Sequence, residues 1–432
     1  MKNPFSTGSR PFSLGWLSPG LGIKRWGVLT LLGIVLVVLG AALAFAYRAL
    51  DFSLSVVAFL ETLSGRFLDS EILGFMLLAM GVVAIVFGVR GVFQSVERVY
   101  EKETHRDFLD VARTRKKLDS AERVVALGGG TGLSTMLRGL KEHSSNITAI
   151  VTMADDGGST GKLREHGMLP PGDLRNCIAA LAEAEPLMTE LFQYRFKGLG
   201  ELKGHSLGNL FMAAMFEKTG DFDLAVREVS KVLAIRGSVL PSTLDDTRMG
   251  AELQDGSEIL GQVNVNQASN IARVFLVPDN PRALPGAVQA IHDAEVIIIG
   301  PGSLFTSIIP NLLVPEIAEA IKKSDVPKIY VCNVMTQPEE TCGFSAADHV
   351  RAMIRHIGPG VVTHVLLNSA KVPDDVLARY SAIGAEYIPP EETEIEMMDV
   401  RAIHGPFIDV SNVVRHHPGK LAAAIFRIAA RV

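Results

Sequence analysis

One stretch, residues 123–134, limits the fold of this chain more than any other. The apolar run Val124 to Leu127 is followed by four glycines within five positions, Gly128, Gly129, Gly130 and Gly132. Thr131 interrupts them, and from Leu133 leucine and methionine recur at helical spacing. This pattern predicts a buried strand, a glycine loop and the start of a helix. Such a loop presents backbone N–H groups and the positive end of a helix dipole, so a phosphate-bearing ligand is the starting hypothesis.

Two common glycine motifs do not fit this loop. The dinucleotide fingerprint needs a small residue where Leu133 stands, and no Gly-Lys-Ser/Thr follows as in a Walker A loop. The alternative to a phosphate site is a tight strand-to-helix turn that binds nothing.

The composition excludes several classes of protein. A net charge of −5 argues against a general nucleic-acid binder. The three cysteines, Cys177, Cys332 and Cys342, form no CxxC pair, which indicates a reducing compartment and no zinc site. Mean hydropathy is high at +0.26, and the apolar excess lies before residue 95.

The first 94 residues predict a membrane anchor. Residues 1–23 are rich in Gly, Pro and Ser, and we expect them to be disordered. Within residues 24–94, the uncharged runs Trp26–Tyr47 and Ile72–Val89 are long enough to form a two-helix transmembrane hairpin. A cleaved signal peptide ending near Ala44-Phe45-Ala46 is the alternative for the first run.

The charges beside the two spans predict their orientation. Lys and Arg flank the outer ends of the hairpin and are sparse in its 48–71 loop, so both chain termini should lie in the cytosol. Residues 95–120 alternate in charge and predict a juxtamembrane connecting helix. The expected location is therefore the cytoplasmic membrane, with two spans and the main domain in the cytosol.

Residues 121–432 alternate strand and helix patterns and predict one Rossmann-like α/β domain with a doubly wound, mainly parallel sheet. Residues 238–265 are interpreted as strands with a hairpin at Asp255-Gly256. Further strands are expected at 147–153, 273–277, 296–299, 328–333 and 363–367, and helices at 283–292, 346–357, 374–380 and the C-terminus.

Polar groups follow the second strand, where such folds meet a ribose or a second ligand. Asp155 and Asp156 come first, then Gly157 and Ser159. Two adjacent carboxylates exceed what a ribose needs and could hold a hydrated cation or orient a second substrate. An Asx-type turn is the alternative interpretation.

Two helix starts carry further candidates. Asp173 has the position of an N-cap, with Arg175 and Asn176 in the first turn beyond it. His205 precedes the helix that contains Asn209, which favours ligand contact as much as a core role.

A second glycine loop follows the apolar strand 296–299. It contains Gly300, Gly302, Ser303 and Thr306. Loops at the carboxyl ends of parallel strands line one crevice, so the two glycine loops together indicate a nucleotide or phosphosugar site.

Several motifs, taken together, resemble one family. They run in order over about 123–415: GGGTGLS, ITAIVTMADDGGSTGKLR, LPPGDLRNC, LFQYRF, GHSLGNLF, SKVLAIRGSVLPST, GPGSLFTSIIPNLLV and YVCNVMTQP. They are similar to the gluconeogenesis factor (YvcK-like) family, which is related to 2-phospho-L-lactate transferase (CofD-like). The resemblance does not extend to the hairpin, which we expect to be an addition to the usual soluble form.

The resemblance implies a bacterial regulator that binds UDP-N-acetylglucosamine and links central carbon metabolism, in gluconeogenic growth, to peptidoglycan synthesis and cell shape. It implies that Gly129 to Thr131 and Gly302-Ser303 approach the diphosphate, and that Arg415 is a late basic contact. The expected ligand-binding residues are Gly128, Gly129, Gly130, Thr131, Gly132, Asp155, Asp156, Gly157, Ser159, Asp173, Arg175, Asn176, His205, Asn209, Gly300, Gly302, Ser303, Thr306, Asn333, Thr336, Gln337 and Arg415. No catalytic residue or metal ligand is assigned.

Two positions depart from the family pattern: Glu339 replaces a glycine after MTQP, and Phe305 replaces a tyrosine in the second loop. The main alternative function is a CofD-like phosphotransferase that moves a phospholactyl-type group from a nucleotide diphosphate to a deazaflavin, with Mg²⁺. An NAD-dependent oxidoreductase is disfavoured by Leu133. A homo-oligomer is allowed by the sequence, and protein partners in wall synthesis or central metabolism stay open.

Overall fold

The structure is a computed structural model that describes residues 108–183, 186–198, 200–410 and 413–430, with the isolated positions Ser55, Ala58, Phe59 and Thr62. The expected segment 1–23 and the hairpin at 24–94 lie outside this range, apart from those positions. The chain divides into two units, 1–117 and 118–432, and each is described by itself. Helix α3 (Phe108–Asp119) falls within the predicted connecting segment 95–120.

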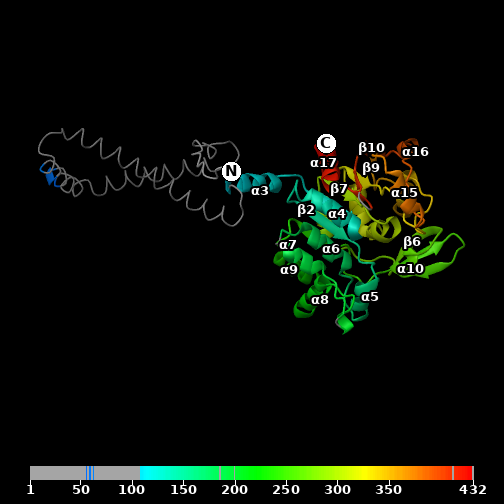
Figure 1. Cartoon of the computed structure of the whole chain (residues 1–432), viewed down its shortest axis with the longest axis horizontal. Helices are drawn as coiled ribbons and strands as arrows, with labels where there is room; N and C mark the ends of the chain where they lie inside the picture. The colour runs from blue at the N-terminus through cyan, green and yellow to red at the C-terminus, as the bar shows by residue number, and fades with distance from the viewer. Residues whose placement is uncertain are drawn as a thin grey trace, which may run out of the picture. The chain divides into compact units, whose positions relative to one another are not determined.

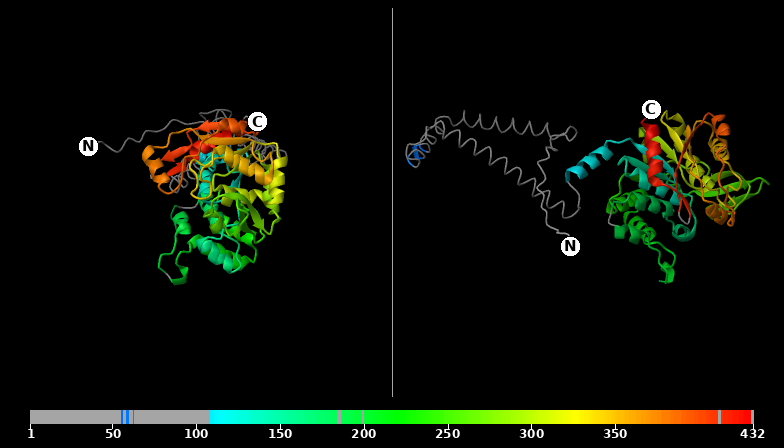
Figure 2. Two further views of the ribbon diagram at one scale, coloured as in Figure 1. Left: turned by 90° about the vertical axis from the view of Figure 1, so that its right-hand side faces the viewer. Right: turned by 45° about the horizontal axis from the view of Figure 1, so that its top comes forward.

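A seven-stranded parallel sheet forms the centre of residues 118–432 (Figures 1 and 2). Its order is β10-β9-β8-β7-β1-β2-β3. The strands are β1 (Val124–Gly128), β2 (Ile147–Val151), β3 (Ser238–Pro241), β7 (Val296–Ile299), β8 (Lys328–Val331), β9 (His364–Asn368) and β10 (Arg401–Gly405). Strand order reverses beside β1, so the predicted doubly wound, Rossmann-like α/β fold is confirmed.

Successive side chains of β1 serve two separate cores. Val124 and Ala126 pack on one face of the sheet, and Val125 and Leu127 on the other. The first face is covered by α4 (Gly130–Leu140), α6 (Gly172–Leu181), α9 (Phe222–Val232) and α17 (Pro418–Ala429). The second is covered by α11 (Pro285–Asp293), α12 (Ile309–Leu312), α13 (Pro315–Lys323) and α14 (Ala346–Ile357). Because both faces are buried, the strands are almost continuously apolar.

Three further helices extend the first face, and one of them, α8, lies beside α9 on one side of the main sheet in Figure 1. They are α5 (Gly158–Glu165), α7 (Pro186–Gln193) and α8 (Leu207–Thr219), with a 3₁₀ turn at Gly200–Leu202 between the last two. Ser206 caps α8, because its side chain accepts a hydrogen bond from the backbone N–H of Asn209.

A small antiparallel sheet packs against the second face, on the side labelled β6 and α10 in Figure 1. It consists of β4 (Arg248–Leu253), β5 (Glu258–Leu260) and β6 (Ile271–Val277). The hairpin predicted at Asp255-Gly256 is confirmed, with Gly256 at φ +82°. The strand expected to continue through Val265 is wrong, because Gln262–Asn266 forms the short helix α10.

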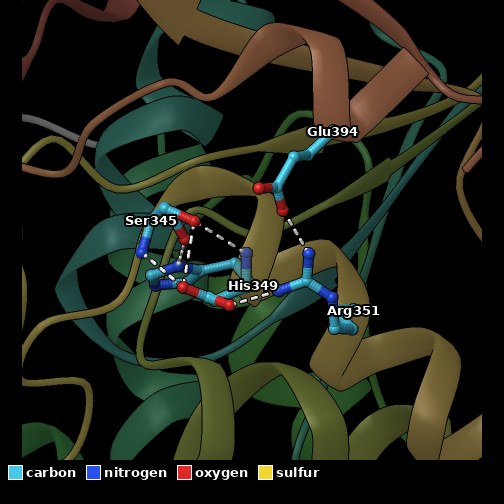
Figure 3. Close-up of polar contacts among 5 residues, drawn as sticks. Ser345, His349, Arg351 and Glu394 are labelled. Atoms are coloured by element: carbon cyan, nitrogen blue, oxygen red, sulfur yellow. Dashed lines mark hydrogen bonds and ion pairs between the residues drawn. The ribbon is translucent and has the colours of Figure 1, made fainter. Parts of the chain in front are cut away.

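The remaining elements lie towards the C-terminus and around the second glycine loop. They are a π-helical turn (Leu304–Ile308), α15 (Asp374–Ser381), α16 (Glu392–Glu396), β11 (Ile408–Val410) and β12 (Val414–His416). Ser345 and Asp348 form a capping box at the start of α14, shown in Figure 3. Arg351 pairs with both Asp348 and Glu394, which joins α14 to α16.

No helix in the described ranges is both long and apolar enough to cross a bilayer alone. The pieces Leu304–Leu312 and Pro315–Lys323 reach that composition only together, across a bend of 78°. Ile309 and Ile317, one from each piece, are fully buried in the second core. The two predicted spans of residues 24–94 stay a prediction.

Candidate functional site

The two glycine loops line one cavity of about 500 Å³. One loop follows β1 and the other follows β7, and these strands are neighbours in the sheet. The cavity therefore lies outside the carboxyl ends of the strands, at the point where strand order reverses. In open α/β sheets this is the usual place for a ligand.

The close approach of the two loops explains why glycine stands at position 132. A Cβ atom added to Gly132 would lie 2.6 Å from the carbonyl oxygen of Pro301, closer than two such atoms approach. Gly302 lies against the carbonyl oxygen of Gly129 in the same contact. Both loops thus present backbone to the cavity with no side chain between them.

Asp173 does not cap its own helix. The N-cap of α6 is Pro171, and the Asp173 carboxylate accepts a hydrogen bond from the backbone N–H of Gly130 instead. A Cβ added to Gly129 would lie 2.4 Å from Asp173 Oδ2, so this glycine makes room for the carboxylate. Removal from water, reinforced by the charge of Asp155, raises the pKa of Asp173 to about 7.

The adjacent carboxylates of Asp155 and Asp156 have different roles. Asp155 lines the cavity and accepts a hydrogen bond from the backbone N–H of Gly157 at 3.0 Å. Burial raises its pKa above the ordinary value. Asp156 lines neither of the cavities described here, and its carboxylate accepts from the backbone N–H groups of Gln262 and Val263. Asp156 was expected to contact the ligand; in the structure its carboxylate holds the first backbone N–H groups of α10.

The second glycine loop is held from inside the protein by Glu340. Its carboxylate accepts from the hydroxyl of Ser303 at 2.7 Å and from the backbone N–H of Phe305 at 2.8 Å. Burial raises the pKa of Glu340. Glu340 was not among the expected site residues, whereas Ser303, which was, lines the cavity.

The far wall of the cavity comes from the C-terminal half of the chain. It is lined by four residues that were expected to bind the ligand: Asn333, Thr336, Gln337 and Arg415. Asn333 is fixed by a hydrogen bond from its amide nitrogen to the carbonyl oxygen of Gly302, at 2.7 Å.

Several lining residues were missed by sequence reasoning: Gln262, Asn266, Ser307, Tyr380, Ile383, Ala385, Val414 and His416. Burial lowers the pKa of His416 to about 4, so the neutral ring donates from Nε2 to the carbonyl oxygen of Cys332. Among these residues, the sequence has two distinctive patterns: the His416-His417 pair, and the alternation of polar and apolar side chains over 262–266. Neither pattern predicts a cavity.

A smaller cavity of about 280 Å³ adjoins the first, and both are lined by Asp155 and Asp173. Its other expected residues are Gly157, Ser159, Arg175, Asn176 and Asn209. Arg195, from the LFQYRF motif, also lines it and was not predicted.

Besides Asp156, three expected residues support the site without lining either cavity: Gly128, His205 and Gly300. His205 Nδ1 lies 2.9 Å from the hydroxyl of Ser159, which it orients. Gly128 ends β1, and Gly300 turns the chain after β7 at φ +77°, a conformation that glycine adopts readily.

Two further features bear on the chemistry. Among the described residues, no group of three or more His, Cys, Asp or Glu side chains is arranged to hold a metal ion. A cavity of about 840 Å³ lies at the opposite ends of β1, β2 and β3, beside α9 and α11. It contains neither glycine loop, so we place the candidate site at the two adjoining cavities.

Comparison with known proteins finds relatives that match most of the chain. The family model for 2-phospho-L-lactate transferase CofD matches residues 124–408, which include both glycine loops. A gluconeogenesis factor homologue of Nostoc sp. is 45% identical over 417 residues, which is 95% of this chain and 91% of the relative. The gluconeogenesis factor of Bacillus subtilis is 47% identical over 306 residues, which is 70% of this chain and 96% of the relative.

A crystal structure of a Bacillus halodurans protein superposes with a TM-score of 0.69 at 47% identity, over 71% of this chain and 99% of that one. Fold, site and sequence together define a CofD-like α/β protein. Within this class, the chain belongs to the gluconeogenesis factor (YvcK) family.

The Nostoc alignment corrects one expectation. The resemblance was expected to stop before the hairpin, but an alignment over 95% of this chain must enter residues 24–94. The Bacillus subtilis relative, aligned over 70%, agrees with the shorter form.

Proposed function

We propose that this chain binds UDP-N-acetylglucosamine at the two adjoining cavities and acts as a regulator that links central carbon metabolism to peptidoglycan synthesis and cell shape. The observation that carries the proposal is the meeting of two glycine loops, from neighbouring parallel strands, at one cavity of about 500 Å³. Two such loops present backbone N–H groups from two directions, which suits a diphosphate.

In this proposal the diphosphate lies between Gly129–Gly132 and Gly302–Ser303. Arg415, on β12, adds a positive charge at the same cavity. The amides of Asn333 and Gln337 supply donors and acceptors for the nucleoside.

Thermal unfolding of the purified full-length chain tests the proposal, with UDP-N-acetylglucosamine, UDP, GDP and NAD compared. A ligand at a hundred times its Kd stabilises the native state by about 2.7 kcal/mol, which raises Tm by several degrees. We expect the largest rise with UDP-N-acetylglucosamine. A rise with GDP or NAD and none with either uridine nucleotide would contradict the proposal.

A CofD-like phosphotransferase is the second candidate, favoured by the family match and by the pair Asp155 and Asp173. Mg²⁺ in nucleotide enzymes is held by one or two carboxylates together with substrate phosphates, so these two residues fit that ion. A bound Mg²⁺ ion would neutralise negative charge on the transferred phosphoryl group. Magnesium-dependent product formation from a guanosine diphosphate donor and a deazaflavin acceptor would establish this function, and its absence would exclude it.

We further propose that residues 24–94 tether the chain to the bacterial cytoplasmic membrane, near the membrane-bound steps of wall synthesis. The two long uncharged runs in the sequence support this. Cell fractionation tests it: the full chain should sediment with membranes and resist high-salt extraction. Recovery in the supernatant fraction would contradict the tether.

A further inference from the structure

Within the proposed function, on which this inference rests, we propose that the smaller cavity binds the sugar ring of the nucleotide sugar. The cavity adjoins the diphosphate position, because Asp155 and Asp173 line both spaces. A ligand whose phosphates lie at the glycine loops therefore has a direct path into it. Its volume of about 280 Å³ is large enough for one ring and too small for a second nucleotide.

Two buried polar atoms beside this cavity have no hydrogen-bond partner in the protein. They are the donor Nε of Arg175 and the acceptor Oδ1 of Asn209. Both residues are more than nine-tenths buried, and both line the cavity. Leaving such groups unpaired is unfavourable, so a ligand that supplies one donor and one acceptor is indicated. A hydroxyl group is both at once.

The charged residues around the cavity suit a ligand with hydroxyl groups. Arg175 and Arg195 are its positive residues, and Asp155 and Asp173 are its negative ones. Hydroxyl groups accept hydrogen bonds from guanidinium groups and donate them to carboxylates. A ligand with several hydroxyl groups can therefore bond to both the arginines and the aspartates.

Arg175 is held in place before any ligand arrives. Its guanidinium donates to the hydroxyl of Ser206 and to the side-chain oxygen of Asn176. A Cβ added to Gly208 would lie 2.8 Å from Arg175 Cδ, so glycine at this position lets the arginine side chain lie flat across the start of α8. Asn209 donates in turn to Ser159, which fixes the side chain with the unpaired oxygen.

The test compares the Kd of UDP-N-acetylglucosamine with the Kd of UDP, because only the first carries the sugar. Isothermal titration of the full-length chain gives both values for wild type, Arg195→Gln and Asn176→Ala. Arg195 and Asn176 are at least partly exposed, so their replacement should leave the fold intact. Thermal unfolding curves measured without ligand check that each variant is folded. Gln262→Ala, which changes the larger cavity only, is the matched control.

We expect wild type to bind the nucleotide sugar more tightly than UDP. In Arg195→Gln this preference should fall by roughly tenfold, as for a lost hydrogen bond to a charged group, and in Asn176→Ala by about threefold, as for a neutral one. The Kd of UDP should change by less than about twofold in both variants. Gln262→Ala should weaken both ligands equally.

Equal weakening of UDP and UDP-N-acetylglucosamine in Arg195→Gln and Asn176→Ala would overturn the inference, because the cavity would then hold a phosphate. The proposed function would survive that result. If wild type binds neither ligand, the proposed function itself fails, so the two failures are distinct.

Discussion

The carboxylate of Asp156 accepts a hydrogen bond from the backbone N–H of Gln262, at 2.9 Å, across 106 positions of sequence. A second bond, from Val263, completes the cap on α10. This contact joins the turn after β2 to the helix whose Gln262 and Asn266 line the larger cavity. Asp156 thus acts on the site through α10 and not through the ligand.

Replacing Asp156 should weaken ligand binding indirectly. Asp156→Ala removes the cap of α10, which should lower the free energy of unfolding by about 1 kcal/mol and weaken UDP binding severalfold. Denaturant titration and calorimetry measure the two effects. Asp221→Ala is the matched control, because the Asp221 carboxylate also accepts from a backbone N–H at a helix start, that of Leu224 in α9, which lines neither cavity of the site. It should cost similar stability and leave the Kd unchanged. A Kd equally affected in both variants would contradict the role of α10.

The contact between the glycine loops makes a separate prediction. In Gly132→Ala the new Cβ would overlap the carbonyl oxygen of Pro301, and the two loops must move apart. We expect a loss of about 1–3 kcal/mol in stability and at least a tenfold weaker Kd for UDP-N-acetylglucosamine. Gly198→Ala is the control, since no atom lies within 4 Å of its added Cβ. Wild-type binding by Gly132→Ala would show that the loops do not form the binding surface.

The raised pKa of Asp173 predicts how stability depends on pH. In the native state this pKa is about 7, against an ordinary 3.8 in the unfolded chain, so the native state holds the proton more tightly. The protonated Asp173 carboxyl group therefore makes its whole contribution to the free energy of unfolding below about pH 4. That contribution is lost as the pH rises to about 7. Asp173→Asn keeps an acceptor for Gly130 and removes the titration.

Between pH 5 and pH 8, Asp173→Asn should gain stability relative to wild type, on the order of 2 kcal/mol. Unfolding curves at several pH values measure this difference. Glu340, whose pKa is also raised, keeps its contribution in both proteins and cancels in the comparison. A difference that does not change with pH would refute the assigned pKa shift.

Glu339 stands where the family pattern has glycine, and its backbone explains the pattern. Its φ is +67°, a left-handed conformation that costs a non-glycine residue about 1 kcal/mol. Its side chain accepts a hydrogen bond from the Ser269 hydroxyl at 2.7 Å. Glu339→Gly and Glu339→Ala both remove that hydrogen bond, but only Glu339→Gly removes the strain of the left-handed backbone conformation. Glu339→Gly should therefore be the more stable of the two by about 1 kcal/mol in denaturant titration, and a reversed order would count against the strain.

Much of the fold was predictable because it depends on local patterns. Continuous apolar runs such as Val124–Leu127 and Val296–Ile299 mark buried parallel strands, and the glycines that follow mark loops close to a ligand. The proximity of the two glycine loops was also predictable from the sequence, since neighbouring parallel strands end at one edge of the sheet.

The errors have a common physical cause, which is long-range contact. Residues 262–266 alternate apolar and polar side chains like a strand, yet they form α10 because Asp156 caps its first N–H groups and Val265 is buried beneath it. Asp173 looks like a local N-cap, but its partner is Gly130, far earlier in the chain. Arg195 and Tyr380 reach the cavities from separate elements, and no local signal marks them.

A crystal structure of the full-length chain with UDP-N-acetylglucosamine tests the central claim most directly. The account predicts the diphosphate between Gly129–Gly132 and Gly302–Ser303, with the sugar ring beside Arg175. Ligand bound instead in the cavity beside α9 and α11, or crystals grown at saturating ligand that show none at the two glycine loops, would contradict it.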